Sequence, residues 1–422
     1  MDAEDLSAMN RCISTNAEGL RPDLLPPERA DGPVRILFLH SQTLGFATHS
    51  RSLEVYSEAH PEIDAVHVRL RPTAALRTVG RQVPGAARSG LDFHRLRHSR
   101  LWEREMRRWF RSSLPLSRFD LVHVMTQHQA IALSHIPFPT RPAMVVQIDA
   151  TTKQECEAFG LGRAWRRSSI RREQRVFEAS SLVVGWSQWA IDSVMDDYAV
   201  PAGRVMLSRP APLVAPGASP AERPSRAVAR IGFIGNAWTR KGGDRLLRWH
   251  QNRWKDRAEL HIYGDVPDLA AGARNVVRYG PIPHAELLDL HLPMLDMVVV
   301  PTLQDTLLLS GVEAASRGVP VITSRLAGVS ETVVHGVTGF LCRHDREEEF
   351  IQSVDALLDN PGKRREMGRA AVEYVQDQWN ADRWHRPFMD TLVEIAQRHR
   401  ALARPVGRRK PGTHRASSTH AR

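Results

Sequence analysis

Short apolar runs alternate with helix-like stretches along this chain from residue 34 onward. Runs such as VRILFLH (34–40), AMVVQID (143–149) and DMVVVPT (296–302) are rich in Val, Ile and Leu and lack the regular apolar–polar alternation of a half-exposed strand. Strands of this kind are buried on both faces, as they are when crossover helices cover both sides of a parallel sheet. The pattern therefore predicts an α/β fold.

The apolar runs form two groups on either side of a Pro-rich segment. Because 422 residues exceed what one hydrophobic core usually spans, the two groups predict two doubly wound, Rossmann-like domains that face each other across a cleft. The expected strands are residues 34–40, 64–71, 120–126, 143–149, 181–187 and 204–210 in the first group, and 229–236, 258–264, 275–280, 296–302 and 319–325 in the second. The expected organisation is a disordered N-terminus (1–32), an N-terminal Rossmann-like domain (33–210), a linker (211–228), a C-terminal Rossmann-like domain (229–380), a terminal helix packing back on the N-terminal domain (381–400) and a basic disordered tail (401–422).

Basic residues are unevenly distributed. The formal net charge is +11, and residues 401–422 carry six basic residues and no acidic one. Between Val66 and Arg118 there are thirteen Arg and three acidic residues, which favours a surface that attracts phosphates or an anionic membrane. A solvated helix face is the alternative that the sequence leaves open. Because no nucleic-acid-binding module is recognised, we do not expect nucleic acid as a partner.

Cysteine content and hydropathy indicate the compartment. Cys12, Cys156 and Cys342 are widely spaced and show no metal-type pairing, which favours a reducing environment. No apolar run approaches the roughly 20 residues that a membrane helix needs. We therefore expect a cytoplasmic protein, with peripheral association at the inner membrane left open by the Arg-rich segment.

The segment 301–341 carries two acidic residues at an informative spacing. Asp305 lies on a loop, and Glu313 follows eight positions later in the expected opening turn of a helix. A helix start offers unpaired N–H groups and a partial positive charge, which suit a diphosphate, while a carboxylate can accept from two neighbouring hydroxyls. A capping box formed by Ser310 and Glu313 is the structural alternative.

The same segment resembles the C-terminal signature of the GT-B fold glycosyltransferases of family 4, which include glycogen-synthase-like and mannosyltransferase-like enzymes. The resemblance extends over about residues 34–400. The matching pieces of the signature are Pro301-Thr302, Asp305, Glu313-Ala314-Ala315, Gly318-Val319-Pro320-Val321, Ala327-Gly328, Glu331 and Gly336-Val337-Thr338-Gly339-Phe340. Upstream, GFIGNAWTRKGGDRLL (232–247) is similar to the family's donor-phosphate loop.

The resemblance implies roles for particular residues. Asp305 and Asp149 are the expected catalytic residues, with Asp305 on the donor sugar and Asp149 at the reacting face. The expected donor-binding residues are Gly235, Asn236, Arg240, Lys241, Leu308, Leu309, Ser310 and Glu313, with Arg240 and Lys241 on the diphosphate and Glu313 on the ribose hydroxyls. Gly45 and His49, near the first strand-to-helix loop, are candidate substrate contacts.

Three departures from the family pattern bear on activity. Asp149 lies at or beside the position where many members carry His, and Asn236 stands where many have Arg. Thr306 to Leu309 replaces the usual Gly-Phe-Gly after the first acid, which affects how closely the backbone can approach the donor. Among the histidines, His40, His49, His123, His128 and His135 show no metal-ligand spacing, so we expect no metal.

The resemblance implies a hexosyltransferase-type enzyme that transfers a sugar from a nucleoside diphosphate sugar to a hydroxyl acceptor, either a glycan, a lipid-linked acceptor or a small molecule. It further implies a retaining, metal-independent reaction that needs no cofactor besides the donor substrate. The alternative is a catalytically weakened sugar-nucleotide-binding or scaffolding protein of the same fold, which the lost glycines and Asp149 suggest.

Overall fold

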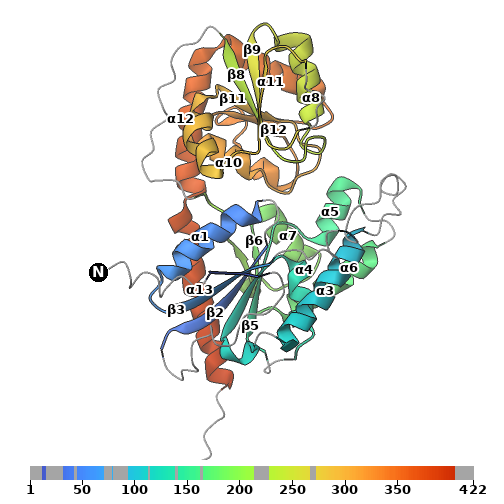
Figure 1. Cartoon of the computed structure of the whole chain (residues 1–422), viewed down its shortest axis with the longest axis vertical. Helices are drawn as coiled ribbons and strands as arrows, with labels where there is room; N and C mark the ends of the chain where they lie inside the picture. Colours follow the sequence, from blue (N-terminus) through green and yellow to red (C-terminus); the bar gives the residue numbers. More distant parts are fainter. Residues whose placement is uncertain are drawn as a thin grey trace, which may run out of the picture.

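The computed structural model describes residues 12–15, 32–41, 45–70, 78, 94–112, 115–137, 141–161, 165–212, 228–266 and 272–403. These residues form two lobes stacked along the long axis of the molecule, each built around a parallel sheet (Figure 1). The fold class predicted from the apolar runs is therefore confirmed.

The sheet of the N-terminal lobe has seven strands in the order β1-β3-β2-β4-β5-β6-β7, all paired in parallel. Its strands are β1 (Cys12–Thr15), β2 (Val34–Ser41), β3 (Ile63–Leu70), β4 (Leu121–Met125), β5 (Ala143–Ile148), β6 (Leu182–Gly185) and β7 (Val205–Leu207). Strands β2, β4, β5 and β6 are buried along their whole length, which explains why their sequences do not alternate.

Helices cover both faces of this sheet and each face has its own apolar core. Side chains from α3, α4 and α6 build the core on one face, and side chains from α1 and the terminal helix α13 build the core on the other. The helices of this lobe are α1 (Phe46–Glu58), α3 (His94–Ser112), α4 (Gln127–Ser134), α5 (Thr152–Phe159), α6 (Arg166–Ala179) and α7 (Gln188–Asp196), and α13 spans Ala381–Ala403.

The sheet of the C-terminal lobe has six parallel strands in the order β10-β9-β8-β11-β12-β13. Its strands are β8 (Ala229–Ile234), β9 (Ala258–Tyr263), β10 (Val276–Gly280), β11 (Met297–Val300), β12 (Val321–Ser324) and β13 (Gly339–Cys342). Its helices are α8 (Gly243–Trp249), α9 (His284–Glu286), α10 (Leu309–Ser316), α11 (Glu347–Asp359) and α12 (Pro361–Gln378). The sheet order reverses direction between β8 and β11, and open α/β sheets bind their ligands at the carboxyl ends of the strands at such a point.

Local signals set several helix starts. Thr151 and Ser187 each lie one residue before a helix, and their side-chain oxygens accept from the backbone N–H three residues later, in α5 and α7. Asn360 does the same for α12, where Pro361 occupies the first helical position. The caps at Thr151 and Ser187 begin the helices that follow the carboxyl ends of β5 and β6.

The terminal helix α13 returns from the C-terminal lobe and runs along the N-terminal lobe (Figure 1). Its residues Phe388, Met389 and Leu392 belong to the same apolar core as β2 and β4. At its far end, the guanidinium of Arg400 donates from Nη2 to Asp120 Oδ2 at 2.6 Å and from Nε to Asp120 Oδ1 at 2.9 Å. No helix of the described residues combines the length and the apolar character that crossing a bilayer requires.

Each predicted strand overlaps an observed one, and two observed strands were not predicted. The expectation of disorder throughout residues 1–32 is wrong for Cys12–Thr15, which pairs in parallel with β3; the backbone hydrogen bonds of an edge strand need no apolar run. Strand β13 lies inside the family signature and was not assigned. Residues 213–227 of the expected linker and 404–422 of the expected tail lie outside the described residues, and the domain boundaries stay a prediction.

Candidate functional site

The predicted donor-binding residues gather at the carboxyl ends of β8 and β11. Gly235 and Asn236 directly follow β8, and Arg240 and Lys241 lie on the turn that leads into α8. Asp305 is on the loop between β11 and α10. These are the two strands at which the sheet order reverses, so the chain topology places the basic and acidic loops side by side.

Asp305 is bound directly by the two cations that the sequence assigned to a diphosphate. Its side chain is about nine-tenths buried, the Nη1 of Arg240 lies 3.4 Å from Oδ1, and the ammonium of Lys241 donates to Oδ2. Arg240 also donates to the carbonyl of Gln304 on the same loop. The sequence predicted all three residues but not that they pair with one another.

The turn that carries the two cations requires glycine. Gly242 has a φ of +76°, and a Cβ at this position would lie 2.1 Å from the carbonyl oxygen of Pro301. The backbone of the basic turn therefore packs directly against the end of β11, and Leu303 N donates to the carbonyl of Arg240 at 2.9 Å. This contact fixes the cations beside the loop of Asp305.

Glu313 does not cap its helix. Helix α10 begins at Leu309 without a side-chain cap, so Glu313 lies in the second turn and the predicted opening-turn position and the capping-box alternative are both wrong. The carboxylate is buried, and its Oε1 lies 2.8 Å from Nε2 of His284 in α9. The hydrogen bond with Glu313 raises the pKa of His284, which favours the imidazolium beside the carboxylate.

The residues that replace the family's Gly-Phe-Gly are mostly turned into the protein. Leu308 is fully buried and Leu309 is half-buried, whereas Ser310 lies in the first turn of α10. The first N–H groups of a helix have no carbonyl partner within the helix. The backbone N–H groups of Leu309 and Ser310, in the first turn of α10, therefore point out of the helix start as hydrogen-bond donors. Any role of these residues toward a donor rests on their backbone.

Asp149 belongs to the N-terminal lobe but contacts the C-terminal lobe. It follows β5, and its Oδ2 accepts from the hydroxyl of Thr306 at 3.0 Å. Burial, with a smaller contribution from Glu155, raises the pKa of Asp149 to about 6, while the Thr306 hydrogen bond acts to lower it. The structure therefore brings both predicted catalytic acids to one loop, since Asp305 and Thr306 are adjacent.

A buried carboxylate holds the loop behind Asp149 in place. Glu173 on α6 accepts from the backbone N–H of Thr152 at 2.9 Å and from the side-chain amide of Gln127 at 2.8 Å, and Gln127 also donates to the carbonyl of Ala150. Burial raises the pKa of Glu173 to about 7. The sequence analysis missed Glu173, because the two partners named here come from separate elements, α4 and α5.

The two candidate substrate contacts differ in their surroundings. A Cβ on Gly45 would lie 2.8 Å from Cδ1 of Leu309, so Gly45 marks a close approach of the two lobes. His49 is buried, with Nε2 3.1 Å from the side-chain oxygen of Gln147, and burial lowers its pKa well below the usual value. A buried, neutral ring committed to the protein core argues against the predicted substrate contact of His49.

A second acidic residue joins the lobes. Glu331, at the end of the 3-10 turn η8 (Ala327–Glu331), accepts from the backbone N–H groups of Gln188 at 3.0 Å and Trp189 at 2.9 Å. Its Oε2 also lies 3.1 Å from Nη2 of Arg209, whose guanidinium stacks on Trp379 at 4.9 Å. Glu331 thus binds the free amides at the start of α7 across the lobe junction. Sequence analysis had placed Glu331 in the signature without a role.

The described residues contain a cluster with the composition of a metal site, and it lies outside the donor loops. His40, Glu54 and His67 in the N-terminal lobe offer ligand atoms that all lie within 4.8 Å of one another. The statement that the histidines show no metal-ligand spacing holds for the sequence, but it missed His67 and the fold that brings it to His40.

The two lobes, each built around a parallel sheet, form a fold that is shared with solved structures of glycosyltransferases. Sucrose-phosphate synthase from Thermosynechococcus elongatus superimposes with a TM-score of 0.64 at 15% identity, over 87% of this chain and 99% of that one. An Anabaena HepE structure in complex with UDP and glucose superimposes with a TM-score of 0.60 at 14% identity, over 86% of this chain and 100% of that one. Structures at this identity show the fold alone.

Sequence comparison gives a match to one family. Residues 228–360 match the family described as Glycosyl transferases group 1. A D-inositol 3-phosphate glycosyltransferase of Kribbella flavida is 26% identical over 231 residues, which are 48% of this chain and 54% of that protein. The chain thus spans about half the length of that curated relative.

Proposed function

We propose that the protein is a glycosyltransferase that moves a sugar from a nucleoside diphosphate sugar to a hydroxyl group of an acceptor. The observation that carries this proposal is the arrangement of Arg240 and Lys241 around Asp305, on loops that meet at the switch point of the second sheet. The match of residues 228–360 to a glycosyltransferase family supports the same proposal.

The cations and the acid have complementary roles toward the donor. A diphosphate entering beside Arg240 and Lys241 offers charged acceptors that share their N–H donors with Asp305, which frees the carboxylate to accept from a sugar hydroxyl. Glu313, which is buried in the second turn of α10 and hydrogen-bonded to His284, accepts from the ribose diol. Charged hydrogen bonds of this kind contribute about 1.5 to 3 kcal/mol each.

The proposed transfer is retaining and needs no metal. As the bond to the anomeric carbon breaks, negative charge develops on the leaving diphosphate, and cations already fixed in the site stabilise this charge without reorganisation. Arg240 and Lys241 are fixed in this sense, because Asp305 and the carbonyl of Gln304 hold them before the donor arrives. Asp149, on the opposite lobe, provides a carboxylate at the reacting face.

The acceptor is proposed to enter from the N-terminal lobe, whose Arg-rich helix α3 suits an anionic surface. The side chains of α3 line a cavity of about 470 Å³ with five arginines and one acid, namely Arg100, Glu103, Arg104, Arg107, Arg108 and Arg111. We propose that this face contacts the headgroups of an anionic membrane. Cosedimentation with vesicles that contain phosphatidylglycerol, but not with phosphatidylcholine vesicles, is the expected result, and binding that ignores both lipid charge and salt contradicts it.

Calorimetric titration with UDP, GDP and ADP sugars tests the donor site. We expect one nucleotide class to bind the wild type, and Glu313→Ala and Lys241→Ala to lose that binding. Lys255→Ala is the matched control, since Lys255 precedes β9 at the amino ends of the strands, and this variant is expected to bind the donor normally. Equal binding by Lys241→Ala and the control would refute the diphosphate assignment.

A sugar-nucleotide-binding protein without turnover is the second candidate. The observation that favours it is the hydrogen bond from Thr306 to Asp149, which commits the reacting-face carboxylate to the protein. Release of nucleoside diphosphate from the bound donor, lost in Asp305→Ala, establishes the enzyme. Tight donor binding with no release in the wild type, over a panel of glycan, lipid and polyol acceptors, establishes the binding protein instead.

A further inference from the structure

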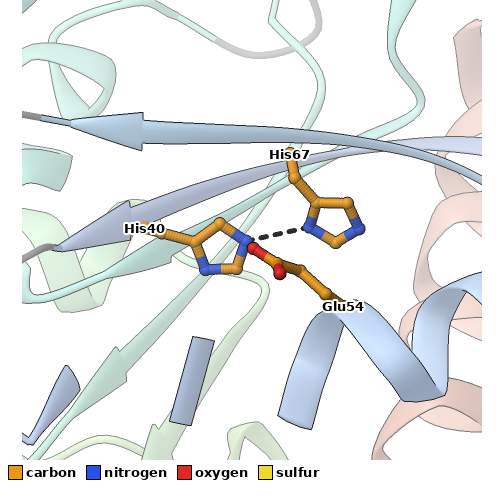
Figure 2. A group of neighbouring side chains, drawn as sticks. All are labelled: His40, Glu54 and His67. Atoms are coloured by element: carbon orange, nitrogen blue, oxygen red, sulfur yellow. Dashed lines mark hydrogen bonds between the residues drawn. The ribbon is translucent and has the colours of Figure 1, made fainter. Parts of the chain in front are cut away.

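Two histidines and a glutamate from three different elements meet on one face of the N-terminal sheet. Figure 2 shows His40 from β2 and His67 from β3 with their rings facing each other, and Glu54 approaching from α1. Nε2 of His40 and Nδ1 of His67 lie 2.8 Å apart, and one carboxylate oxygen of Glu54 lies within 4.8 Å of both rings' ligand atoms. These three side chains lie outside the donor loops of the C-terminal lobe.

The network around His67 defines which nitrogen is free to bind an ion. The Ser57 hydroxyl donates to the carbonyl of Glu54 at 3.1 Å, so its oxygen accepts from Nε2–H of His67 at 3.1 Å. Nδ1 of His67 therefore carries a lone pair and accepts from Nε2–H of His40. A metal-bound histidine commonly donates its other ring N–H to such a neighbour, which fixes the ring for coordination.

Burial keeps both rings neutral. His40 and His67 are almost completely buried, and desolvation lowers the pKa of His67 to about 4 and that of His40 well below its usual value. Neutral imidazole is the form that binds metal ions, and imidazole with one carboxylate is a donor set that suits zinc.

We propose that His40, His67 and Glu54 form a binding site for one Zn²⁺ ion in the N-terminal lobe. The ion replaces the proton shared between the two rings, and the proton of His40 moves from Nε2 to Nδ1, an atom with no hydrogen-bond partner in the described structure. Tetrahedral coordination with Zn–N bonds of about 2.0 to 2.1 Å places two ligating nitrogens about 3.3 Å apart. The present 2.8 Å spacing therefore has to widen by only about half an ångström.

The ion would link β2, β3 and α1. Because α1 starts beside Gly45, which approaches Leu309 of the other lobe, such a link fixes the helix that borders the lobe junction. Its role is structural, and it takes no part in the sugar transfer proposed above. The zinc proposal stands or fails independently of that activity.

Arg69 supplies an internal test of the site. The guanidinium of Arg69 makes three hydrogen bonds with the carboxylate of Glu54, at 2.6, 2.7 and 3.1 Å. Arg69 therefore competes with a metal ion for this carboxylate, and its positive charge repels the ion. Replacing Arg69 with Gln should therefore tighten zinc binding, whereas Glu54→Gln should weaken it. A structural role of Glu54 alone would change stability in both variants but would not move zinc affinity in opposite directions.

The experiment uses the full chain after dialysis against a chelator. Calorimetric titration with Zn²⁺ is expected to give about one ion per chain, and Co²⁺ is expected to show the visible bands of tetrahedral coordination. We expect His67→Gln and Glu54→Gln to weaken binding by about tenfold or more, Arg69→Gln to tighten it, and the control His135→Gln, on the surface outside the cluster, to leave it unchanged.

Folding and stability measurements keep the result interpretable. Zn²⁺ should raise the Tm of the wild type and of Arg69→Gln, and it should do so less in Glu54→Gln. If His67→Gln does not fold, the two variants of half-buried side chains decide the question. Absence of stoichiometric Zn²⁺ binding by the wild type, or equal affinity in Glu54→Gln, Arg69→Gln and the wild type, overturns the proposal.

Discussion

The hydrogen bond between Thr306 and Asp149 makes a quantitative prediction about pH. Thr306→Val keeps the shape of the side chain and removes the donor that lies 3.0 Å from Asp149 Oδ2. A hydrogen bond to a charged group contributes about 1.5 to 3 kcal/mol, and one pKa unit corresponds to about 1.4 kcal/mol. Because the side chain of Asp149 is only half-buried, we take the lower end of this energy range and expect the pKa of Asp149 to rise by about one unit.

The sign of the effect follows from which form is needed. If transfer requires the ionised carboxylate, the rate increases as pH rises through the pKa of Asp149, which is about 6 in the native protein. With a pKa near 7, the ionised fraction at pH 6.5 falls from about three-quarters to about one-quarter. Thr306→Val should therefore lose about two-thirds of its activity at pH 6.5 and very little at pH 8.5.

The assay is release of nucleoside diphosphate from the donor that calorimetry identifies, followed from pH 5 to pH 9. Thr391→Val is the control, since Thr391 bonds to the carbonyl of Pro387 within α13. A profile in which Thr306→Val lowers the maximum without moving the acidic limb would show that ionisation of Asp149 does not limit the rate.

Three further perturbations follow from contacts at the donor turn, the lobe junction and the terminal helix. Gly242→Ala places a methyl group against the carbonyl of Pro301, so donor affinity by calorimetry should fall by more than tenfold, and unchanged affinity would contradict the fixed turn. Glu331→Ala removes the carboxylate that binds the first two amides of α7 and leaves the Ser187 cap in place; the loss costs about 0.5 to 2 kcal/mol, as for a helix cap, and should speed amide hydrogen exchange at the start of that helix, whereas equal exchange would show that the contact is not formed in solution. Arg400→Ala should lower the free energy of unfolding in urea by about 2 to 3 kcal/mol through loss of its paired hydrogen bonds to Asp120, and a change below about 0.5 kcal/mol would contradict this estimate.

The strands of this protein could be predicted because burial on both faces leaves a direct trace in the sequence. Runs such as Val298, Val299 and Val300 contain only apolar residues, and each predicted run overlaps a strand. The strand Cys12–Thr15 has no such trace, since a short edge strand is held by backbone hydrogen bonds to one neighbour.

The site was predictable as a set of residues but not as a set of contacts. Lys241 and Asp305 were each assigned to the donor, yet their mutual ion pair depends on two loops that are 64 positions apart. His284 escaped notice because it precedes Glu313 by 29 positions on another element. Spacing along the chain carries no information about such pairs, which arise only when parallel strands bring their carboxyl ends to one edge.

Helix α13 has a consequence for how the protein is made. The sheet of the N-terminal lobe is synthesised before residue 208, yet one of its two faces is covered in part by Phe388, Met389 and Leu392, which are synthesised only after the C-terminal lobe. The C-terminal lobe, whose own core ends near Met367, has all its parts earlier. The N-terminal lobe of the nascent chain therefore carries a partly uncovered apolar face until α13 emerges, so a chain truncated before Ala381 would expose part of that face to aggregation and chaperones.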